Sequence, residues 1–420
     1  MRRTRVIVAL VAAAALAATA ACGGDKPTDN KTTTTLKLYN DKGAWSQYFK
    51  DLGSLSKDQI NLGMEPVGYT DAATYDAFIK ASFRTNVKPD LFTWHTGGQL
   101  AEVVKAGHIA DTSALWSEAI SKGYLTESLK QYYTIDGKQY CIPLNIGYWV
   151  MFYNKKVFAD AGLSEPKSWA DLTSAAATLK AKGVTPFYQT AELFNFVWFQ
   201  QMLVGSDPEL YNKLGTGKAK FTDPGVVKVM EEWKKLIDSG YMNNAGDKTE
   251  PQALLKSGKV AMAPFGTWFN TSLTKEGLKS GTDYGMFLIP NLNPSNTKTT
   301  MLFESGPLCI LDKAPDKAAS MKFAKWWLEP AAQEKWANSR GDVSANPKVS
   351  IPDPTTNNIN KVAGGTDVAL ASRFFELVPA PILTAALDAF GAFTVKPADY
   401  MKQLQTLQKV ADDYWSKNGG

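Results

Sequence analysis

The stretch "YTIDGKQYCIPLNIGYWVMFYN", residues 133–154, decides the fold class of this 420-residue chain. An Asp-Gly pair marks a turn, and the residues after it form one long run of aromatic and β-branched side chains, which is typical of a strand. Within a chain that otherwise alternates strands and helices, a strand of this length can cross from one lobe to another. The stretch therefore predicts a crossing strand between two lobes.

Strands and helices alternate on both sides of this run. Short strands such as "PDLFTW" (89–94) alternate with amphipathic helices, an order typical of parallel βα units. A second strand-rich run, "MLFESGPLCIL" (301–311), predicts another crossing strand. Helices are predicted over 74–83, 97–107, 166–184, 221–241 and 316–329, and the tail from 366 to 417 is predicted to be mostly helical. The fold class is therefore α/β, with two lobes built from discontinuous chain.

The N-terminus has the features of an export signal. "MRRTRVIVALVAAAALAATAAC" carries three arginines and then a run of small apolar residues that ends at Cys22. We predict a signal peptide over 1–21, lipid attachment at Cys22 and a flexible, polar tether over 22–35. The mature protein would be anchored to the outer face of the cell membrane, which is the periplasmic side in a Gram-negative cell. Ordinary cleavage beside an unmodified Cys22 is the alternative.

Charge and composition exclude several classes of function. Removing three signal arginines from the 46 Lys and Arg residues leaves 43, against 41 Asp and Glu. A nearly neutral chain has no electrostatic reason to bind nucleic acid. With two histidines and three cysteines in the whole chain, we expect no metal site, and no motif indicates a cofactor.

Five motifs resemble a known family. The most specific is "YNKKVFADAGLSEPKSWADL", and all five follow the family's order along nearly the whole mature chain. They lie at 89–109, 136–144, 153–172, 258–268 and 316–336. The chain resembles the extracellular solute-binding proteins, family 1, of ABC importers, whose best-known relatives bind maltose and other oligosaccharides.

The resemblance implies a type II periplasmic-binding-protein fold, in which two hinged lobes close on a solute. On this basis the N-terminal lobe would comprise 36–145 plus 305–347, and the C-terminal lobe 146–304 plus 348–420. Cys141 and Cys309 would lie on neighbouring hinge strands, close enough for a disulfide. Two small buried thiols are the alternative.

Sugar binding requires aromatic plates for the C–H face of a ring and polar groups for its hydroxyls. Trp94 and Trp268 match family positions whose tryptophans stack on sugar. Trp149 and Trp198 lie in the crossing strand and beside a loop break, where either ligand contact or packing is open. His95 stands near the position of a binding carboxylate in the maltose-binding branch, a departure that leaves the identity of the sugar uncertain.

Polar candidates come from three segments. Asp41 and Lys42 match a hydroxyl-binding Asp-Lys pair of that branch, although "NDKG" also suits a plain turn. Glu192 and Phe194 fall where the branch has a Glu followed by aromatics. Glu304, on the second crossing strand, could meet either a ligand hydroxyl or a residue of the other lobe.

The predicted function is therefore a lipid-anchored receptor, monomeric and not an enzyme, that captures a sugar of two to four units. It would deliver this oligosaccharide to the transmembrane subunits of an ABC permease. The same fold with a non-sugar solute is one alternative. An exported glycoside hydrolase is another, but no motif singles out an acid and base pair.

Overall fold

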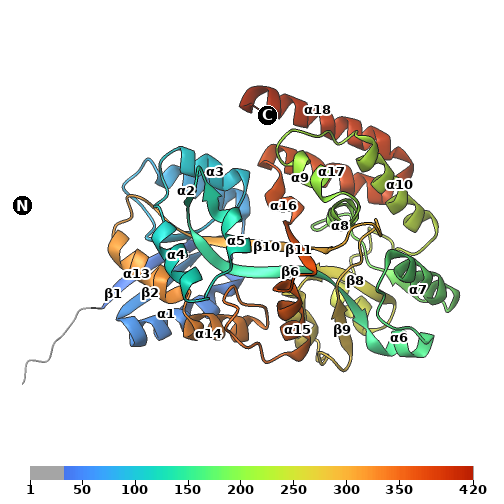
Figure 1. The fold of residues 1–420 in the computed structure, drawn as a ribbon, viewed down its shortest axis with the longest axis horizontal. Helices are drawn as coiled ribbons and strands as arrows, with labels where there is room; N and C mark the ends of the chain where they lie inside the picture. The colour runs from blue at the N-terminus through green and yellow to red at the C-terminus, as the bar shows by residue number, and fades with distance from the viewer. Residues whose placement is uncertain (1–32, 420) are drawn as a thin grey trace, which may run out of the picture. The chain divides into compact units, whose positions relative to one another are not determined.

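Two long antiparallel strands, β6 (Ile142–Asn154) and β10 (Thr299–Ile310), run side by side through the middle of the fold (Figure 1). The structure is a computed structural model and describes residues 33–419. The predicted signal peptide, Cys22 and nearly all of the predicted tether lie outside the described residues. β6 is the run that predicted a crossing strand, and the structure confirms it as one strand of 13 residues.

Both long strands belong to one mixed sheet. Within the described residues it has nine strands, in the order β2-β1-β3-β10-β6-β8-β7, with β11 paired to β10 and β9 paired to β6. β1 lies parallel to β2 and β3, as the alternation of strands and helices predicted. The remaining strands are β1 Thr34–Asn40, β2 Leu62–Gly68, β3 Leu91–Thr93, β7 Thr185–Phe187, β8 Val260–Gly266, β9 Tyr284–Phe287 and β11 Val368–Ser372, and a separate hairpin joins β4 Thr134–Ile135 and β5 Lys138–Gln139.

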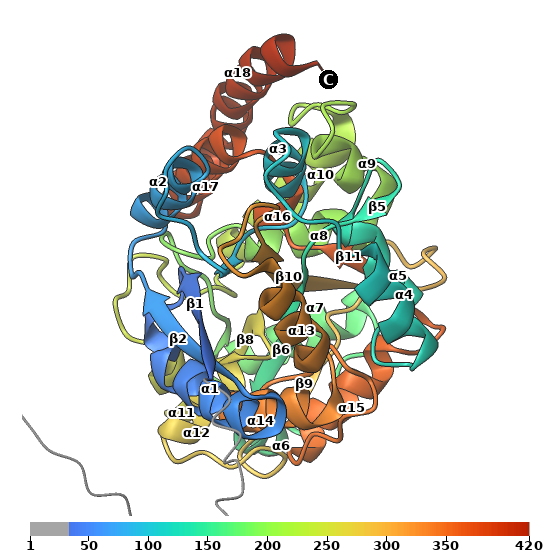
Figure 2. The same cartoon turned by 90° about the vertical axis from the view of Figure 1, so that its left-hand side faces the viewer.

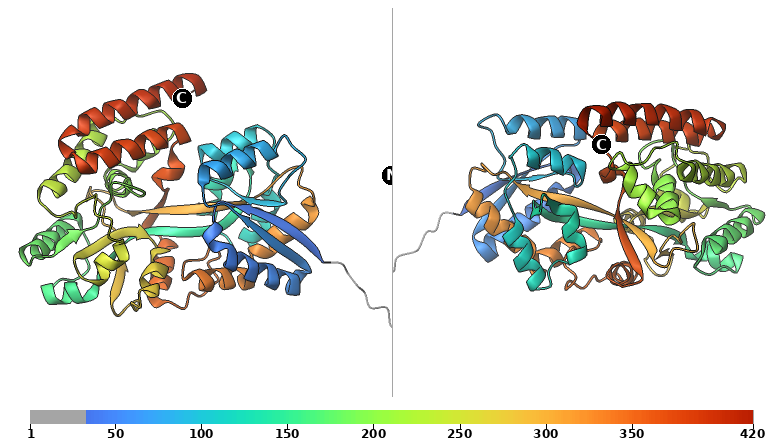
Figure 3. Two further views of the ribbon diagram at one scale, coloured as in Figure 1. Left: turned by 180° about the vertical axis from the view of Figure 1, so that it is seen from behind. Right: turned by 45° about the horizontal axis from the view of Figure 1, so that its top comes forward.

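The two long strands change partners along their length. β10 pairs with β3 through Leu308–Ile310, whereas β6 pairs with β8 and β9 between Trp149 and Asn154. Between these regions the two strands pair with each other. They therefore connect the β1-β2-β3 group to the β7-β8-β9 group, which is the crossing arrangement that the sequence predicted (Figures 1 and 3).

Helices pack around this sheet. α1 lies along β2, and α17 lies beside α18 (Figures 2 and 3). No helix within residues 33–419 is both long and apolar enough to cross a lipid bilayer. The α-helices are α1 Ser46–Ile60, α2 Ala72–Ser82, α3 Gly98–Lys105, α4 Ser113–Ser121, α5 Glu127–Lys130, α6 Lys155–Ala161, α7 Trp169–Ala181, α8 Val197–Ser206, α9 Pro208–Leu214, α10 Pro224–Asp238, α11 Pro251–Lys256, α12 Phe269–Lys275, α13 Lys317–Trp327, α14 Pro330–Arg340, α15 Pro354–Ala363, α16 Phe374–Leu377, α17 Ala380–Val395 and α18 Tyr400–Asn418.

The helix at the start of the most specific motif shows why it begins where it does. Ser168 caps α7: its side chain accepts a hydrogen bond from the backbone of Asp171, and the Asp171 side chain accepts one from the backbone of Ser168. This reciprocal pair satisfies two backbone donors that a helix start leaves free. α7 therefore begins at Trp169.

Alternation along β6 supplies two hydrophobic cores. Val150 and Phe152 face one cluster of buried side chains, whereas Trp149, Met151 and Tyr153 face another. Successive side chains of a strand point to opposite faces, so a strand buried on both faces is apolar at nearly every position. This explains why β6 is apolar along its length except at Asn145 and at its last residue, Asn154.

A disulfide joins the two long strands. Cys141 and Cys309 are bonded, with their Cα atoms 4.2 Å apart and 168 residues apart in sequence. Cys309 is also paired with Phe92 of β3. The bond therefore ties β10 to the start of β6 beside the β1-β2-β3 group.

The C-terminal tail is mostly helical, as predicted, but it begins with a strand. Residues 368–372, inside the tail predicted to be mostly helical, form β11, which lies parallel to β10. The rest of the tail contains α16, α17 and α18, as predicted. The segment "VALAS" has no strong strand preference of its own, so its pairing with β10 decides its conformation.

Candidate ligand-binding site

A cavity of about 480 Å³ brings together three of the predicted binding residues, Glu192, Phe194 and Trp268. Its walls come from the loop that follows β7, from the segment 245–252, and from the end of β8 with the first turn of α12. Ligand pockets of this kind usually measure roughly 300–1,000 Å³. We call this cavity the aromatic pocket.

Aromatic rings form one wall of the aromatic pocket. The Phe194 and Trp268 ring centroids are 5.4 Å apart, and Phe265 lies 5.9 Å from Trp268 and 4.3 Å from Phe269. Phe194 and Trp268 are only partly buried, so their rings reach the pocket. Such a wall offers large, rigid apolar area for a ligand.

Gly266 makes room for the Trp268 ring. A Cβ atom at Gly266 would lie 2.2 Å from Nε1 of Trp268, far inside ordinary contact distance. Only a residue without a side chain fits there while the indole keeps its place. The "GTW" sequence at 266–268 is thus a local requirement of the pocket wall.

Polar groups also line the aromatic pocket. Glu192 is exposed and forms an ion pair with Lys248, and Asp247 and Glu250 line the same pocket. Hydrogen bonds from Thr249 lower the pKa of Asp247, which keeps this carboxylate ionised. Ionised carboxylates each accept more than one hydrogen bond, which suits hydroxyl groups.

Trp149 is buried and packs against the two rings, Phe194 and Trp268, that line the pocket. Its ring is 2% exposed and lies 5.6 Å from Phe194 and 6.2 Å from Trp268. Its Nε1–H is buried and has no hydrogen-bond partner among the described residues. Phe194, whose ring contacts Trp149, has a backbone φ of +72°, a left-handed conformation that costs a side-chain-bearing residue about 1–2 kcal/mol.

A second group of predicted residues follows β1. Lys42 Nζ lies 2.9 Å from Asp41 Oδ2, and the Thr93 hydroxyl donates to Asp41 Oδ1 at 2.6 Å. Burial acts to raise the pKa of Asp41, but the charge of Lys42 and the hydrogen bond from Thr93 outweigh it and lower the pKa. Lys42 also approaches the crossing strands, since a Cβ at Gly306 would lie 3.6 Å from its Cε.

Glu304 is held in a buried ion network. Arg373 Nη1 lies 2.5 Å from Glu304 Oε2, and Arg373 also pairs with Glu376 of α16. Burial raises the pKa of Glu304, although Arg373 acts in the opposite direction. Burial would lower the pKa of Arg373, but Glu304 and Glu376 outweigh it and raise that pKa. Sequence reasoning missed Arg373 and Glu376, because Arg373 lies 69 residues from Glu304 in the chain and no local signal joins them.

The crossing strands connect Glu304 to the aromatic pocket. Gly147 of β6 is paired with Glu304 of β10. A Cβ at Gly147 would lie 3.3 Å from Glu304 Cγ and 3.5 Å from Trp268 Cδ1. The Glu304 side chain therefore lies beside the tryptophan that lines the pocket.

Three predicted residues lie elsewhere. Trp94 is 3% exposed and donates to the Gln99 carbonyl at 3.1 Å, and Trp198 is 2% exposed and donates to the Tyr188 carbonyl at 2.9 Å. Neither lines the aromatic pocket, and both rings pack in a core in this conformation. His95 is partly buried, and its Nε2 lies 3.5 Å from Asp76 Oδ1.

Metal binding finds no support in the described part of the chain, where no three acidic, His or Cys side chains gather as possible ligands.

Comparison with known proteins agrees with this architecture. The family model for bacterial extracellular solute-binding proteins matches residues 47–362. An uncharacterized ABC transporter extracellular-binding protein of Pyrococcus horikoshii is 26% identical, over 92% of this chain and 88% of the relative. The diacetylchitobiose binding protein of Streptomyces coelicolor is 25% identical, over 90% and 89% of the two chains.

Solved structures share the fold. A chitin oligosaccharide binding protein superposes with a TM-score of 0.75 and 22% identity, over 91% of this chain and 98% of its own. The predicted two-lobed type II fold is thereby confirmed. Because the family model that matches this chain describes extracellular solute receptors, the alternative of a glycoside hydrolase is set aside. The chain belongs to the bacterial extracellular solute-binding proteins.

Proposed function

We propose that the protein is the solute receptor of an ABC importer and that its solute is a carbohydrate of two to four sugar units. The observation that carries this proposal is the aromatic pocket, which Phe194 and Trp268 line together with Glu192, Asp247 and Glu250. Aromatic plates suit the C–H face of a sugar ring, and carboxylates suit its hydroxyl groups. The names of the Streptomyces relative and of the superposed structure support the same class of solute.

Closure would complete the site. We propose that the lobes follow the predicted boundaries, 36–145 plus 305–347 and 146–304 plus 348–420, so that closure bends β6 and β10. Asp41 and Lys42 would then contact the solute from the N-terminal lobe. Because a ligand shifts a conformational equilibrium only by its differential affinity, contacts made only in the closed state would favour closure.

One buried group would also join the site. The Trp149 N–H has no hydrogen-bond partner within residues 33–419, and the ring of Phe194, a residue with a left-handed backbone, lies 5.6 Å from the Trp149 ring. A buried donor without a partner costs about 1–3 kcal/mol. We propose that Phe194 moves when solute enters and that the Trp149 N–H then donates to a sugar oxygen. Trp94, Trp198 and His95 would support the site from behind it.

A thermal-shift screen tests the class of solute. A ligand at a thousandfold excess over its dissociation constant stabilises the native state by about 4 kcal/mol. We expect some di- to tetrasaccharide to raise the melting temperature and to be recovered unchanged. A response confined to polyamines, phosphate esters or peptides would support the receptor role but refute the proposal that the solute is a sugar. Released monosaccharide would contradict the receptor role.

Membrane attachment is a separate proposal. We propose that Cys22 carries the lipid anchor, that the receptor is a monomer, and that it delivers solute to the permease subunits. Mass spectrometry of protein from its native membrane should find a lipidated N-terminal cysteine, and Cys22→Ala should release the protein from the membrane. Wild-type protein recovered with an unmodified cysteine would refute the anchor.

A further inference from the structure

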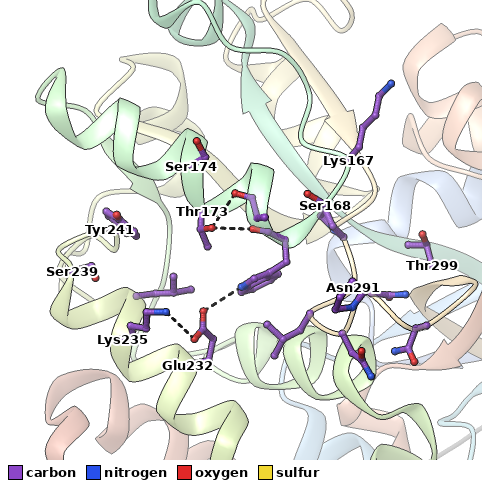
Figure 4. Close-up of a pocket in the computed structure, with 18 residues that line it drawn as sticks. Lys167, Ser168, Thr173, Ser174, Glu232, Lys235, Ser239, Tyr241, Asn291 and Thr299 are labelled. Atoms are coloured by element: carbon purple, nitrogen blue, oxygen red, sulfur yellow. Dashed lines mark hydrogen bonds and ion pairs between the residues drawn. The ribbon is translucent and has the colours of Figure 1, made fainter.

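A larger hollow, of about 800 Å³, lies on elements that the aromatic pocket does not use. The N-terminal turns of α7, the second half of α10 and the segment 290–299 line it (Figure 4). None of the predicted binding residues belongs to its lining. We call it the α7–α10 hollow.

One side of the hollow is an aromatic ring held by a carboxylate. Trp169 is partly exposed, and its Nε1 donates to Glu232 Oε1 at 3.2 Å. Lys235 Nζ lies 3.5 Å from the other carboxylate oxygen, and Figure 4 shows both α10 side chains on the same side of the hollow. The indole is thus fixed in place before any ligand arrives.

The other side is a loop fixed by its own hydrogen bonds. Asn291 donates to the Lys298 carbonyl at 2.7 Å and accepts from the Thr300 backbone at 3.1 Å. Asn296 donates to the Gly205 carbonyl at 2.9 Å. A wall that is already ordered loses little conformational entropy when a ligand binds.

The lining restricts the chemistry of a ligand. Apolar surface comes from Trp169, Leu236, Pro290, Leu292 and Pro294, and polar groups from Glu232, Tyr241 and several Ser, Thr and Asn side chains. A purely apolar ligand would strip water from these polar groups without replacing the hydrogen bonds. The lining holds two lysines, of which Lys235 is already paired with Glu232 and Lys167 is exposed to solvent, so a small anion would find no buried positive charge.

We propose that the α7–α10 hollow is a second saccharide site, with Trp169 as its plate and Glu232 as its hydroxyl acceptor. The choice of saccharide rests on the proposed function, but every lining residue is separate from the aromatic pocket. All of them lie between 167 and 299, on one predicted lobe, so binding here requires no closure. The site is accordingly weaker than the first, and its occupancy does not depend on the first.

Indole N–H signals of ¹⁵N-labelled protein test the site, with raffinose and diacetylchitobiose as probes. The Trp169 signal is identified by its absence in Trp169→Phe, and the Trp268 signal by its absence in Trp268→Phe. We expect the Trp169 signal to shift as saccharide is added, with a higher dissociation constant than the Trp268 signal shows. The same Trp169 shift should appear in Trp268→Ala. Glu232→Gln should raise the dissociation constant that the Trp169 signal shows about tenfold. Glu231→Gln, one residue away and bonded to Tyr400, is the matched control and should leave it unchanged.

The outcomes separate this site from the proposed function. If the Trp268 signal shifts and the Trp169 signal does not, the second site is refuted and the proposed function stands. If the Trp169 shift disappears in Trp268→Ala, it is a relayed effect and the site is refuted. If only Trp169 responds, the second site stands and the assignment of the aromatic pocket fails. If neither signal responds to either probe, the saccharide assignment of both sites is overturned.

Discussion

Replacing Gly266 by alanine should displace Trp268 without removing any group from the pocket. The added Cβ would lie 2.2 Å from Trp268 Nε1, 2.7 Å from Cδ1 and 2.9 Å from Cε2, whereas ordinary contact begins near 3.4 Å. The ring must therefore move by about 1.2 Å, the difference between 3.4 Å and 2.2 Å. Overpacking of this kind costs roughly 1–3 kcal/mol.

Solute affinity should fall together with stability. If Trp268 is a binding anchor, its loss costs about 1–3 kcal/mol of affinity, and a displaced ring loses much of that. Urea unfolding measures the first effect, and isothermal titration with the saccharide from the screen measures the second. Gly98→Ala is the matched control, because a Cβ at Gly98 meets nothing within 4 Å.

A double mutant isolates the cause. In a Trp268→Ala background the clash is absent, so Gly266→Ala should cost less than about 0.5 kcal/mol, a clear departure from additivity. A cost that persists unchanged in that background would refute the steric reasoning. Wild-type affinity in Gly266→Ala, despite lowered stability, would refute the role of the ring.

Two further predictions concern stability. Replacing both Cys141 and Cys309 by alanine should lower the free energy of unfolding by about 2–5 kcal/mol, since the disulfide closes a loop of 168 residues. Reductant should not change the stability of this variant. Equal urea midpoints for the wild type with and without reductant would contradict the disulfide. Asp41→Asn should lower the free energy of unfolding at pH 6, and its difference from wild type should narrow as the pH falls below 3.8. The pKa of Asp41 is lowered in the folded protein, so its ionised form stabilises the fold above pH 3.8 and this stabilisation is lost as Asp41 is protonated. A gap that stays constant between pH 6 and 3 would contradict the ion pair with Lys42.

The crossing strands could be read from the sequence because their signal is local. A strand buried on both faces is apolar at nearly every position, and the run from Ile142 to Tyr153, with Asn145 as its exception, shows this directly. The helix α7 was also predicted, over 166–184, although its start at Trp169 is set by the capping pair Ser168 and Asp171. Both features depend on residues close together in the chain.

Other features depend on distant partners. Arg373 meets Glu304 across 69 residues, and although the strand pattern marked Glu304 as a candidate, no local pattern marks Arg373 as its partner. The side to which Trp94 and Trp198 turn is decided by core packing, which the sequence around each ring does not encode. Phe194 takes its left-handed backbone from the loop around it, and nothing in its side chain predicts this.

The most direct test of the proposed site is the affinity of Trp268→Ala for the saccharide that stabilises the wild type, measured by isothermal titration. Trp415→Ala, a partly exposed tryptophan of α18 outside the aromatic pocket, is the control. We predict that Trp268→Ala lowers affinity about 5- to 150-fold and that Trp415→Ala retains wild-type affinity. Wild-type affinity in a folded Trp268→Ala variant would contradict the assignment of the aromatic pocket as the solute site.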